Sequence, residues 1–211
     1  IELVKLASLI ITLNKSIACA NRVEQVMTVP AGMTFPEDTA AEKTERGTIT
    51  FKHVSMEYEG SGEDTLTDIN FEVQQGQTVG IIGGTGSGKS TMMNLIPRFY
   101  DVSQGEVLVD GIDVRKYAAH QLIDKIGIVP QKAVLFKGTI RDNMKWGNEN
   151  ATDEEIQQAI VMAQAEEVVN SKKGGLDYPL EQMGRNLSGG QKQRLTIARA
   201  LVKKPEILIL D

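Results

Sequence analysis

A glycine-rich stretch in the first half of the chain constrains the fold more than any other feature. It reads Gly83-Gly84-Thr85-Gly86-Ser87-Gly88-Lys89-Ser90-Thr91, the pattern G-x-x-x-x-G-K-S followed by a second hydroxyl residue. Its glycines permit backbone conformations closed to residues with a Cβ, so successive N–H groups can point at a phosphate. The pattern holds phosphates when a strand precedes it and a helix follows it, so the flanking residues decide the interpretation.

The flanking sequence supplies that context. Residues 78–82 form a short apolar run with a β-branched bias, which predicts a strand. After the loop, an apolar helical pattern runs from Met92 to Ile96, and its N-terminal dipole would favour an anion. In this interpretation Lys89 reaches the β- and γ-phosphates and the Ser90 hydroxyl ligates Mg²⁺. The alternative is a flexible glycine-rich turn, which requires neither the lysine nor the two hydroxyl residues.

The end of the chain supplies a second half for this site. Residues 207–210 are four consecutive apolar residues, which predict a fully buried strand, and Asp211 follows them. In a phosphate-loop protein, a carboxylate at this place binds Mg²⁺, usually through water. An incidental aspartate after a buried strand is the alternative.

A second glycine motif lies about a hundred residues after the loop and reads Asn186-Leu187-Ser188-Gly189-Gly190-Gln191. Ser188 is suited to cap a helix that begins at Gly189, and the two glycines permit close approach to a phosphate. The two motifs together resemble the nucleotide-binding domain of ABC transporters, whose signature clamps the nucleotide of a partner subunit. An ordinary glycine-rich helix start is the alternative.

The resemblance extends from about residue 46 to the end and implies roles for three more residues. Tyr58 matches the aromatic residue that stacks on adenine, although strands favour tyrosine in any case. Gln131 matches the glutamine that contacts Mg²⁺ or the attacking water, and Pro130 should end the preceding strand. Asp211 resembles the Walker B aspartate.

The resemblance implies an α/β fold: a phosphate-loop NTPase core with an antiparallel β subdomain and a helical signature subdomain, preceded by an N-terminal helix. It implies ATP and Mg²⁺ as ligands. The general base in the family is a glutamate directly after the Walker B aspartate, which here is Asp211, the last residue given. These 211 residues alone are therefore expected to bind Mg-ATP and to hydrolyse it negligibly. The implied ATP-binding residues are Tyr58, Gly83, Gly84, Thr85, Gly86, Ser87, Gly88, Lys89, Ser90 and Thr91. The implied metal-binding residues are Ser90, Gln131 and Asp211, and Gln131 is also catalytic. The implied signature residues, which bind the partner's ATP, are Leu187, Ser188, Gly189, Gly190 and Gln191.

Residues 1–29 differ from the rest of the chain. Apolar residues recur there at steps of four and three, which predicts a helix with one apolar stripe: Leu6, Ile10, Leu13, Ile17 and Ala20. Charged residues interrupt the run, so we do not expect a complete transmembrane span. An amphipathic packing helix is the alternative, but before an ABC domain residues 16–23 resemble the cytoplasmic end of the last transmembrane helix of an exporter. We therefore expect a fragment with a linker at 30–47 and a C-terminally incomplete ABC domain at 48–211.

Shorter patterns predict the rest of the secondary structure. Strand patterns occur at 49–51, 66–73 and 107–109, with turns at 60–62 and at Asp110-Gly111. Thr152 and Glu155 have the spacing of a capping box at a helix start.

Composition limits the function further. With 211 residues, of which 41% are hydrophobic, the chain can bury one sizeable α/β core. Its net charge of −5 argues against a general nucleic-acid or anionic-lipid binder. Cys19 is the single cysteine, and His53 and His120 are too isolated to suggest a metal site.

The resemblance therefore implies the ATPase domain of an ABC exporter at the cytoplasmic face of the cell membrane. Its implied partners are a second half-transporter and its own or an associated transmembrane domain. Alternatives are a non-hydrolysing regulatory half and a soluble ABC ATPase outside transport. Residues 180–186 resemble the half of heterodimeric exporters that has a slow or inactive site of its own. Homodimeric exporters more often have a Gly-Glu pair near Gly184, and Arg185 departs from that pattern; a homodimer is the other possibility.

Overall fold

The computed structural model describes residues 2–29, 32–38, 46–58 and 60–211. The chain divides into two compact units, Ile1–Thr34 and Phe35–Asp211. Within the expected linker, 32–38 and 46–47 form neither helix nor strand, whereas 30–31 and 39–45 lie outside the described residues. The two units are described separately below.

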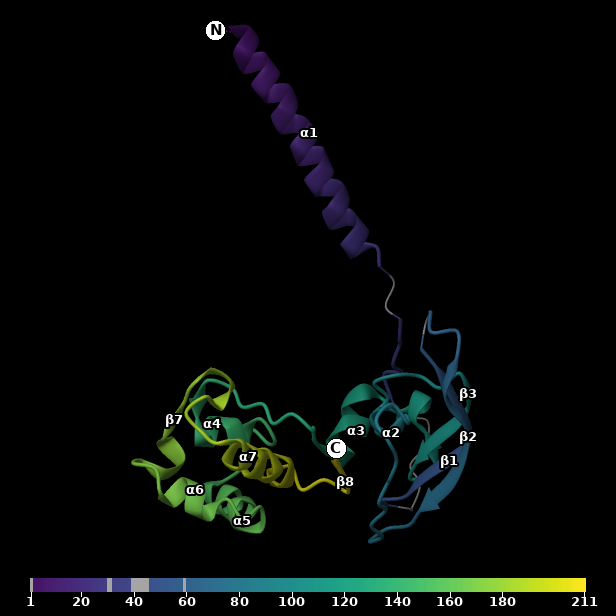
Figure 1. Ribbon diagram of the computed structural model, residues 1–211, viewed down its shortest axis with the longest axis vertical. Coiled ribbons are helices and arrows are strands. Elements are labelled where there is room, and N and C mark those ends of the chain that lie inside the picture. Colours follow the sequence, from purple (N-terminus) through teal and green to yellow (C-terminus); the bar gives the residue numbers. More distant parts are fainter. Residues whose placement is uncertain (1, 30–31, 39–45, 59) are drawn as a thin grey trace. The chain divides into compact units, whose positions relative to one another are not determined.

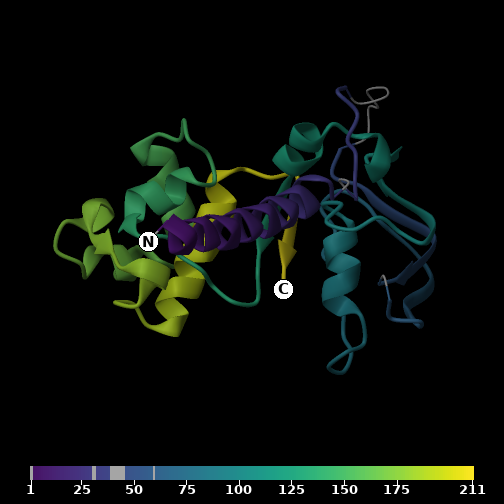
Figure 2. The same cartoon turned by 90° about the horizontal axis from the view of Figure 1, so that it is seen from above.

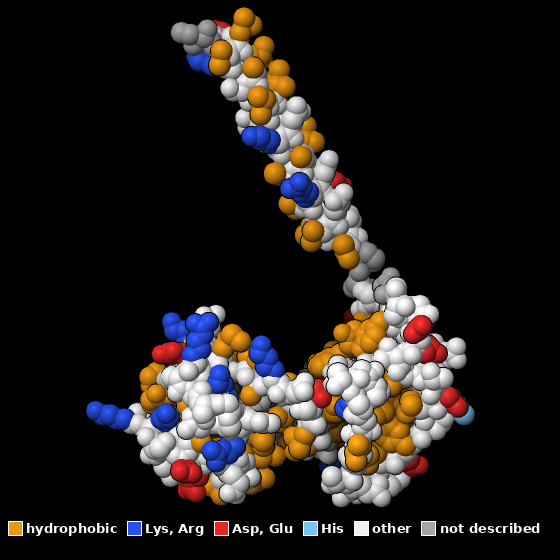
Figure 3. All heavy atoms as spheres, in the orientation of Figure 1, with side chains coloured by type: hydrophobic (Ala, Val, Ile, Leu, Met, Phe, Trp, Pro, Cys, Tyr) orange, Lys and Arg blue, Asp and Glu red, His pale blue; other side chains and the backbone are white. Residues whose placement is uncertain are grey.

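The first unit contains one long helix, α1 (Glu2–Met27), as the apolar stripe predicts. Its side chains are all exposed, and hydrophobic ones occur along its whole length (Figure 3). By length and composition alone, this helix could cross a membrane, since its most apolar window has a mean hydropathy of 1.5. The charged residues are too sparse to lower the mean hydropathy below that of a span. The assignment of residues 1–29 to the cytoplasmic end of a transmembrane helix stays a prediction.

The second unit contains a four-stranded antiparallel sheet in the order β2-β1-β3-β4. Figure 1 shows β1, β2 and β3 of this sheet. Its strands are β1 (Ile49–Glu57), β2 (Asp64–Val73), β3 (Gln104–Val109) and β4 (Ile112–Asp113). The β3–β4 hairpin turns through Asp110 and Gly111, which both have positive φ, as a two-residue type I′ turn requires. The predicted antiparallel subdomain is therefore present.

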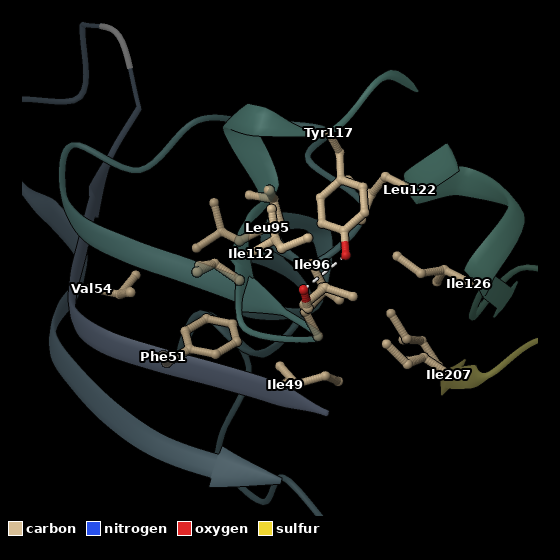
Figure 4. Packing of buried hydrophobic residues seen from close by; sticks show 14 of the residues in the cluster. Ile49, Phe51, Val54, Leu95, Ile96, Ile112, Tyr117, Leu122, Ile126 and Ile207 are labelled. Atoms are coloured by element: carbon tan, nitrogen blue, oxygen red, sulfur yellow. Dashed lines mark hydrogen bonds between the residues drawn. The ribbon is translucent and has the colours of Figure 1, made fainter. Parts of the chain in front are cut away.

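The sheet packs against two helices, α2 (Lys89–Leu95) and α3 (Ala119–Lys125), with the 3₁₀ turn η1 (Val114–Lys116) between β4 and α3. Phe51, Leu95 and Leu122 are fully buried in this first core (Figure 4). The Tyr117 hydroxyl donates a hydrogen bond to the Val109 carbonyl at 2.9 Å, so the one polar atom of this buried ring has a partner (Figure 4).

A parallel pair, β5 (Ile126–Val129) and β8 (Ile207–Leu210), extends the first core. Two expectations are corrected here. Residues 78–82 form no strand, and β8 alternates buried with exposed residues rather than being buried throughout. Among the described residues, β8 pairs only with β5 and no strand pairs with 78–82, so apolar side chains remain exposed: Val79, Ile81, Ile82, Leu208 and Leu210.

Helices dominate the remaining part, which has a second hydrophobic core. Figure 2 shows α7 (Gly189–Val202) in yellow; it packs against α4 (Ile140–Lys145) and α5 (Asp153–Met162). As predicted, Thr152 caps α5 in a capping box with Glu155. The smaller elements here are β6 (Gly138–Thr139), α6 (Glu166–Asn170), η2 (Gly175–Asp177), β7 (Pro179–Leu180) and η3 (Gln182–Gly184).

Candidate functional site

The glycine-rich loop turns directly into α2, and two of its glycines are required by the backbone. Gly86 and Gly88 have φ of 81° and 82°, values that favour glycine. A Cβ on Gly88 would also lie 2.7 Å from the Leu66 side chain and 2.9 Å from the Thr65 carbonyl oxygen. The loop is therefore held against β2, and its last glycine could not be replaced without moving that strand.

Lys89 folds back over this loop. Its Nζ donates hydrogen bonds to the carbonyl oxygens of Gly83 at 2.9 Å and Gly84 at 2.7 Å. The ammonium group therefore lies inside the curve of the loop, where a phosphate chain would run. A phosphate oxygen is a stronger acceptor for this group than a neutral carbonyl, because both partners are then charged.

Ser90 and Asp211 meet at the end of β8. Ser90 Oγ lies 3.2 Å from Asp211 Oδ1, and both residues are exposed. The backbone N–H of Asp211 donates to the Val129 carbonyl at 2.9 Å, so the β5–β8 ladder extends to this carboxylate. A hydroxyl and a carboxylate are oxygen donors of the kind that Mg²⁺ takes together with phosphate and water. No group of three or more His, Cys, Asp or Glu side chains suited to a metal occurs in the described residues, so phosphate and water would complete such a site.

Gln131 reaches the same edge of the parallel pair. It is exposed and follows β5, which ends at Val129 just before Pro130, as predicted. Because Val129 is the register partner of Leu210, the chain after β5 begins beside Asp211. The structure therefore brings Gln131 to the same end of the strands as the carboxylate.

Tyr58 lies against the helix that follows the loop. Its hydroxyl is 3.0 Å from Thr91 Oγ1, and its ring meets Tyr100 edge-on at 5.1 Å between ring centroids. Tyr58 follows β1, which lies between β2 and β3, so it is not an edge-strand residue. Sequence reasoning missed Tyr100, because no periodicity or spacing relates a residue after α2 to one after β1.

The signature opens α7 with a complete capping box. Ser188 Oγ accepts a hydrogen bond from the Gln191 N–H at 3.3 Å, and Gln191 Oε1 accepts one from the Ser188 N–H at 3.0 Å. Leu187 is buried beneath this turn. Neither Gly189 nor Gly190 has positive φ, and no atom lies within 4 Å of a Cβ added at either position. Packing within this chain therefore does not require glycine here, and the helix presents bare backbone to solvent.

The structure does not join the signature to the phosphate loop. The helix α7 belongs to the second core, whereas α2 belongs to the first. Within the described ranges, no hydrogen bond connects residues 187–191 with residues 83–91. The chain thus presents two separate phosphate-suited surfaces.

Comparison with known proteins gives consistent results. The family described as "ABC transporter" matches residues 66–211. The putative multidrug export ATP-binding/permease protein YgaD of Bacillus subtilis (strain 168) is 42% identical over 200 residues, which cover 95% of this chain and 34% of that protein. The uncharacterized ABC transporter ATP-binding protein YwjA of the same strain is 45% identical over 166 residues, covering 79% of this chain and 29% of that protein.

A solved structure is similar over the same extent. The structure of a bacterial Atm1-family ABC exporter with ATP bound has a TM-score of 0.86 and 34% identity, and the match covers 95% of this chain and 35% of that one. The chain therefore spans about a third of the length of the proteins it matches.

Proposed function

The chain belongs to the ABC transporter family, and from this premise we propose that it is the ATP-binding and ATP-hydrolysing domain of an exporter. In this proposal, ATP-driven closure of two such domains is coupled to substrate movement across the membrane. The observation that carries the proposal is the contact between Ser90 and Asp211 beside the glycine-rich loop. It unites a phosphate cradle and two Mg²⁺-suited oxygens in one place.

Each residue of this site has a role that follows from its position. The N–H groups of the loop and the Lys89 ammonium bind the phosphates, while Ser90 and Asp211 hold Mg²⁺. Bound there, Mg²⁺ would supply positive charge that offsets the negative charge of the phosphates. Gln131, at the same strand end, orients that water or contacts the metal. Tyr58, fixed by Thr91 and Tyr100, provides a ring for the adenine base.

The second surface serves a partner subunit. Ser188 and the exposed backbone of Gly189 and Gly190 can approach a phosphate closely, as a capped helix start allows. Since this surface is separate from the chain's own loop, we propose that it closes on the ATP of a second half-transporter.

The first unit connects this domain to the membrane. The exposed apolar surface of α1 suits the cytoplasmic end of a transmembrane helix, with the nucleotide-binding domain at the cytoplasmic face. YgaD, whose name includes a permease, supports the inclusion of a transmembrane domain in the same protein.

Cross-linking in the full-length protein tests the proposal. In a background without native cysteines, Ser87→Cys in the loop of one subunit and the exposed Gln193→Cys on α7 of the other should form a disulfide when ATP is added and its hydrolysis is prevented. Without nucleotide the cross-link should be weak. A cross-link that is insensitive to ATP, or confined to one subunit, would contradict the proposal. A non-hydrolysing regulatory half would cross-link but release no phosphate, and a soluble ABC ATPase would not fractionate with membranes.

A further inference from the structure

Lys125 bridges two carboxylates from distant parts of the chain. Its Nζ lies 2.8 Å from Asp110 Oδ2 and 3.0 Å from Glu206 Oε2. Asp110 forms the turn between β3 and β4, whereas Glu206 is the residue directly before β8. One ammonium group therefore connects the antiparallel sheet with the strand that leads to Asp211.

The Asp110 end of this bridge is firmly placed. The Asp110 side chain is only 4% exposed, and its Oδ1 also accepts a hydrogen bond from the Thr48 N–H at 3.1 Å. Burial opposes the charge of Lys125, but the hydrogen bonds to Asp110 and Glu206 outweigh it and raise the lysine pKa. The Lys125 ammonium is thus charged throughout the physiological range, and one of its two partners is anchored in the core.

The Glu206 end sets the start of the parallel ladder. Lys125 directly precedes β5, and its carbonyl accepts the Glu206 N–H at 2.9 Å. From there the register continues through Ile126↔Ile207 to Val129↔Leu210 and ends with the bond from Asp211 to Val129. Both the side chain and the backbone of Lys125 therefore bind Glu206, the residue directly before this ladder.

The register of β8 decides where Asp211 lies. A slip of one residue would move the carboxylate by about 3.3 Å and turn it to the opposite face of the strand. The ladder is only four residue pairs long, and β8 has one strand partner within the described residues. Such a short pairing has few backbone hydrogen bonds to resist a slip.

We propose that Lys125 is a positioning residue for the metal site: through Glu206 it fixes the register of β8 and so keeps Asp211 beside Ser90. The inference rests on the proposed function, because it assigns Ser90 and Asp211 to Mg²⁺. Lys125 itself touches neither of them.

Nucleotide binding with and without Mg²⁺ tests the role of Lys125. In the full-length protein, the affinity for ATP is measured with Mg²⁺ and with EDTA for the wild type, Lys125→Met, Glu206→Ala and Lys125→Arg. Lys125→Met and Glu206→Ala should each reduce the Mg²⁺-dependent gain in affinity by about tenfold, the lower end of the losses seen for residues that support metal ligands. The affinity in EDTA should stay within about twofold, since the loop and Lys89 are unaltered. Lys125→Arg should restore the gain, because it keeps both ion pairs.

Two features of the design separate the possible outcomes. Lys125→Met leaves buried Asp110 without its cation and risks misfolding. If Lys125→Met does not fold, Glu206→Ala tests the positioning role alone, because it leaves the pair between Lys125 and Asp110 intact. A Glu206→Ala protein with an undiminished Mg²⁺-dependent gain overturns the inference, whatever its thermal midpoint. Asp211→Asn is the reference: if it loses the gain while the Lys125 and Glu206 variants keep it, only the positioning role fails. If the wild type shows no Mg²⁺-dependent gain, the proposed function fails and the inference with it.

Discussion

Ser90 Oγ lies 3.2 Å from Asp211 Oδ1, although 121 positions separate the two residues in the chain. One belongs to the first turn of α2 and the other follows β8, so the contact depends on both the loop geometry and the register of the strand. No local interaction could produce it. Its presence therefore reports on the assembly of the whole nucleotide site.

The first prediction is that Ser90 and Asp211 act as one unit. Ser90→Ala and Asp211→Asn should each weaken Mg-ATP binding. The double variant should bind Mg-ATP little more weakly than the single variant with the larger loss, because both changes disrupt one metal site. The measurement is a double-mutant cycle on ATP affinity at fixed Mg²⁺ in the full-length protein, with an expected coupling energy of about 1–3 kcal/mol. Strictly additive losses would show that the two oxygens do not share a ligand.

A second prediction concerns Lys89. Lys89→Ala should abolish ATP binding, since it removes charge-assisted hydrogen bonds to two phosphates. Isothermal titration checks this, with Lys137→Ala as a control that removes an exposed lysine outside the site. Equal ATP affinity in the wild type and Lys89→Ala would refute the assignment of the loop.

The third prediction uses the buried ring of Tyr117. Burial, with a smaller contribution from the Asp110 charge, raises its pKa from 10.0 to about 12. Since the folded pKa is the higher one, the neutral hydroxyl contributes stability that is complete below pH 10 and disappears as the pH rises towards about 12. In denaturant titrations at pH 9 and pH 11, the wild type should lose more free energy of unfolding than Tyr117→Phe.

At neutral pH the same variant provides the control for Tyr117. Tyr117→Phe leaves the Val109 carbonyl without its 2.9 Å hydrogen bond and should lower the free energy of unfolding by about 1 kcal/mol. If the two proteins lost equal stability between pH 9 and pH 11, Tyr117 would not be the responsible group.

The fourth prediction concerns the uncovered apolar edge. Ile82 is 99% exposed and Leu210 is 60% exposed, and neither 78–82 nor the free side of β8 has a strand partner in the described part of the chain. Expressed alone, this chain should self-associate through these edges. Light scattering should show less association for Ile82→Thr and Leu210→Thr, with little change in thermal midpoint because little packing is lost. A monodisperse wild-type monomer would contradict this expectation.

Local patterns predicted much of this fold correctly. The capping box at Thr152, the cap at Ser188 and the turn at Asp110-Gly111 are interactions within a few residues, so the sequence alone specifies them. The loop at 83–91 and the strand at 207–210 were placed for the same reason.

The failures involve interactions between distant segments. Residues 78–82 have the composition of a strand but no partner among the described residues, and strand formation requires one. Tyr100 and the bridge through Lys125 depend on which elements become neighbours, and no sequence period encodes that. The contact between Ser90 and Asp211 is expected only from the roles that these residue types have in a phosphate-loop protein, since no local pattern brings them together.

The last prediction separates stability from function in the signature. Gly190 is helical, and a Cβ added there would meet no atom within 4 Å. Gly190→Ala should therefore raise the free energy of unfolding by as much as about 0.5–1 kcal/mol, because alanine restricts the unfolded chain more than glycine does. Yet the same methyl group would stand between the helix start and a phosphate of the partner, so turnover should fall in the assembled transporter. Stability and activity would then change in opposite directions.

Two further variants show that this opposition is specific to the signature. Gly105→Ala should destabilise the domain, because Gly105 has φ of 81° and its Cβ would lie 2.2 Å from the His53 carbonyl oxygen. Ser188→Ala should lower both quantities, since it removes the cap of α7, which is worth about 1 kcal/mol, together with the hydroxyl that we propose for the partner's nucleotide. The measurements are denaturant unfolding and ATPase rate for each variant. A Gly190→Ala transporter with full activity would mean that no phosphate approaches this helix, because the added methyl group would otherwise stand in its way.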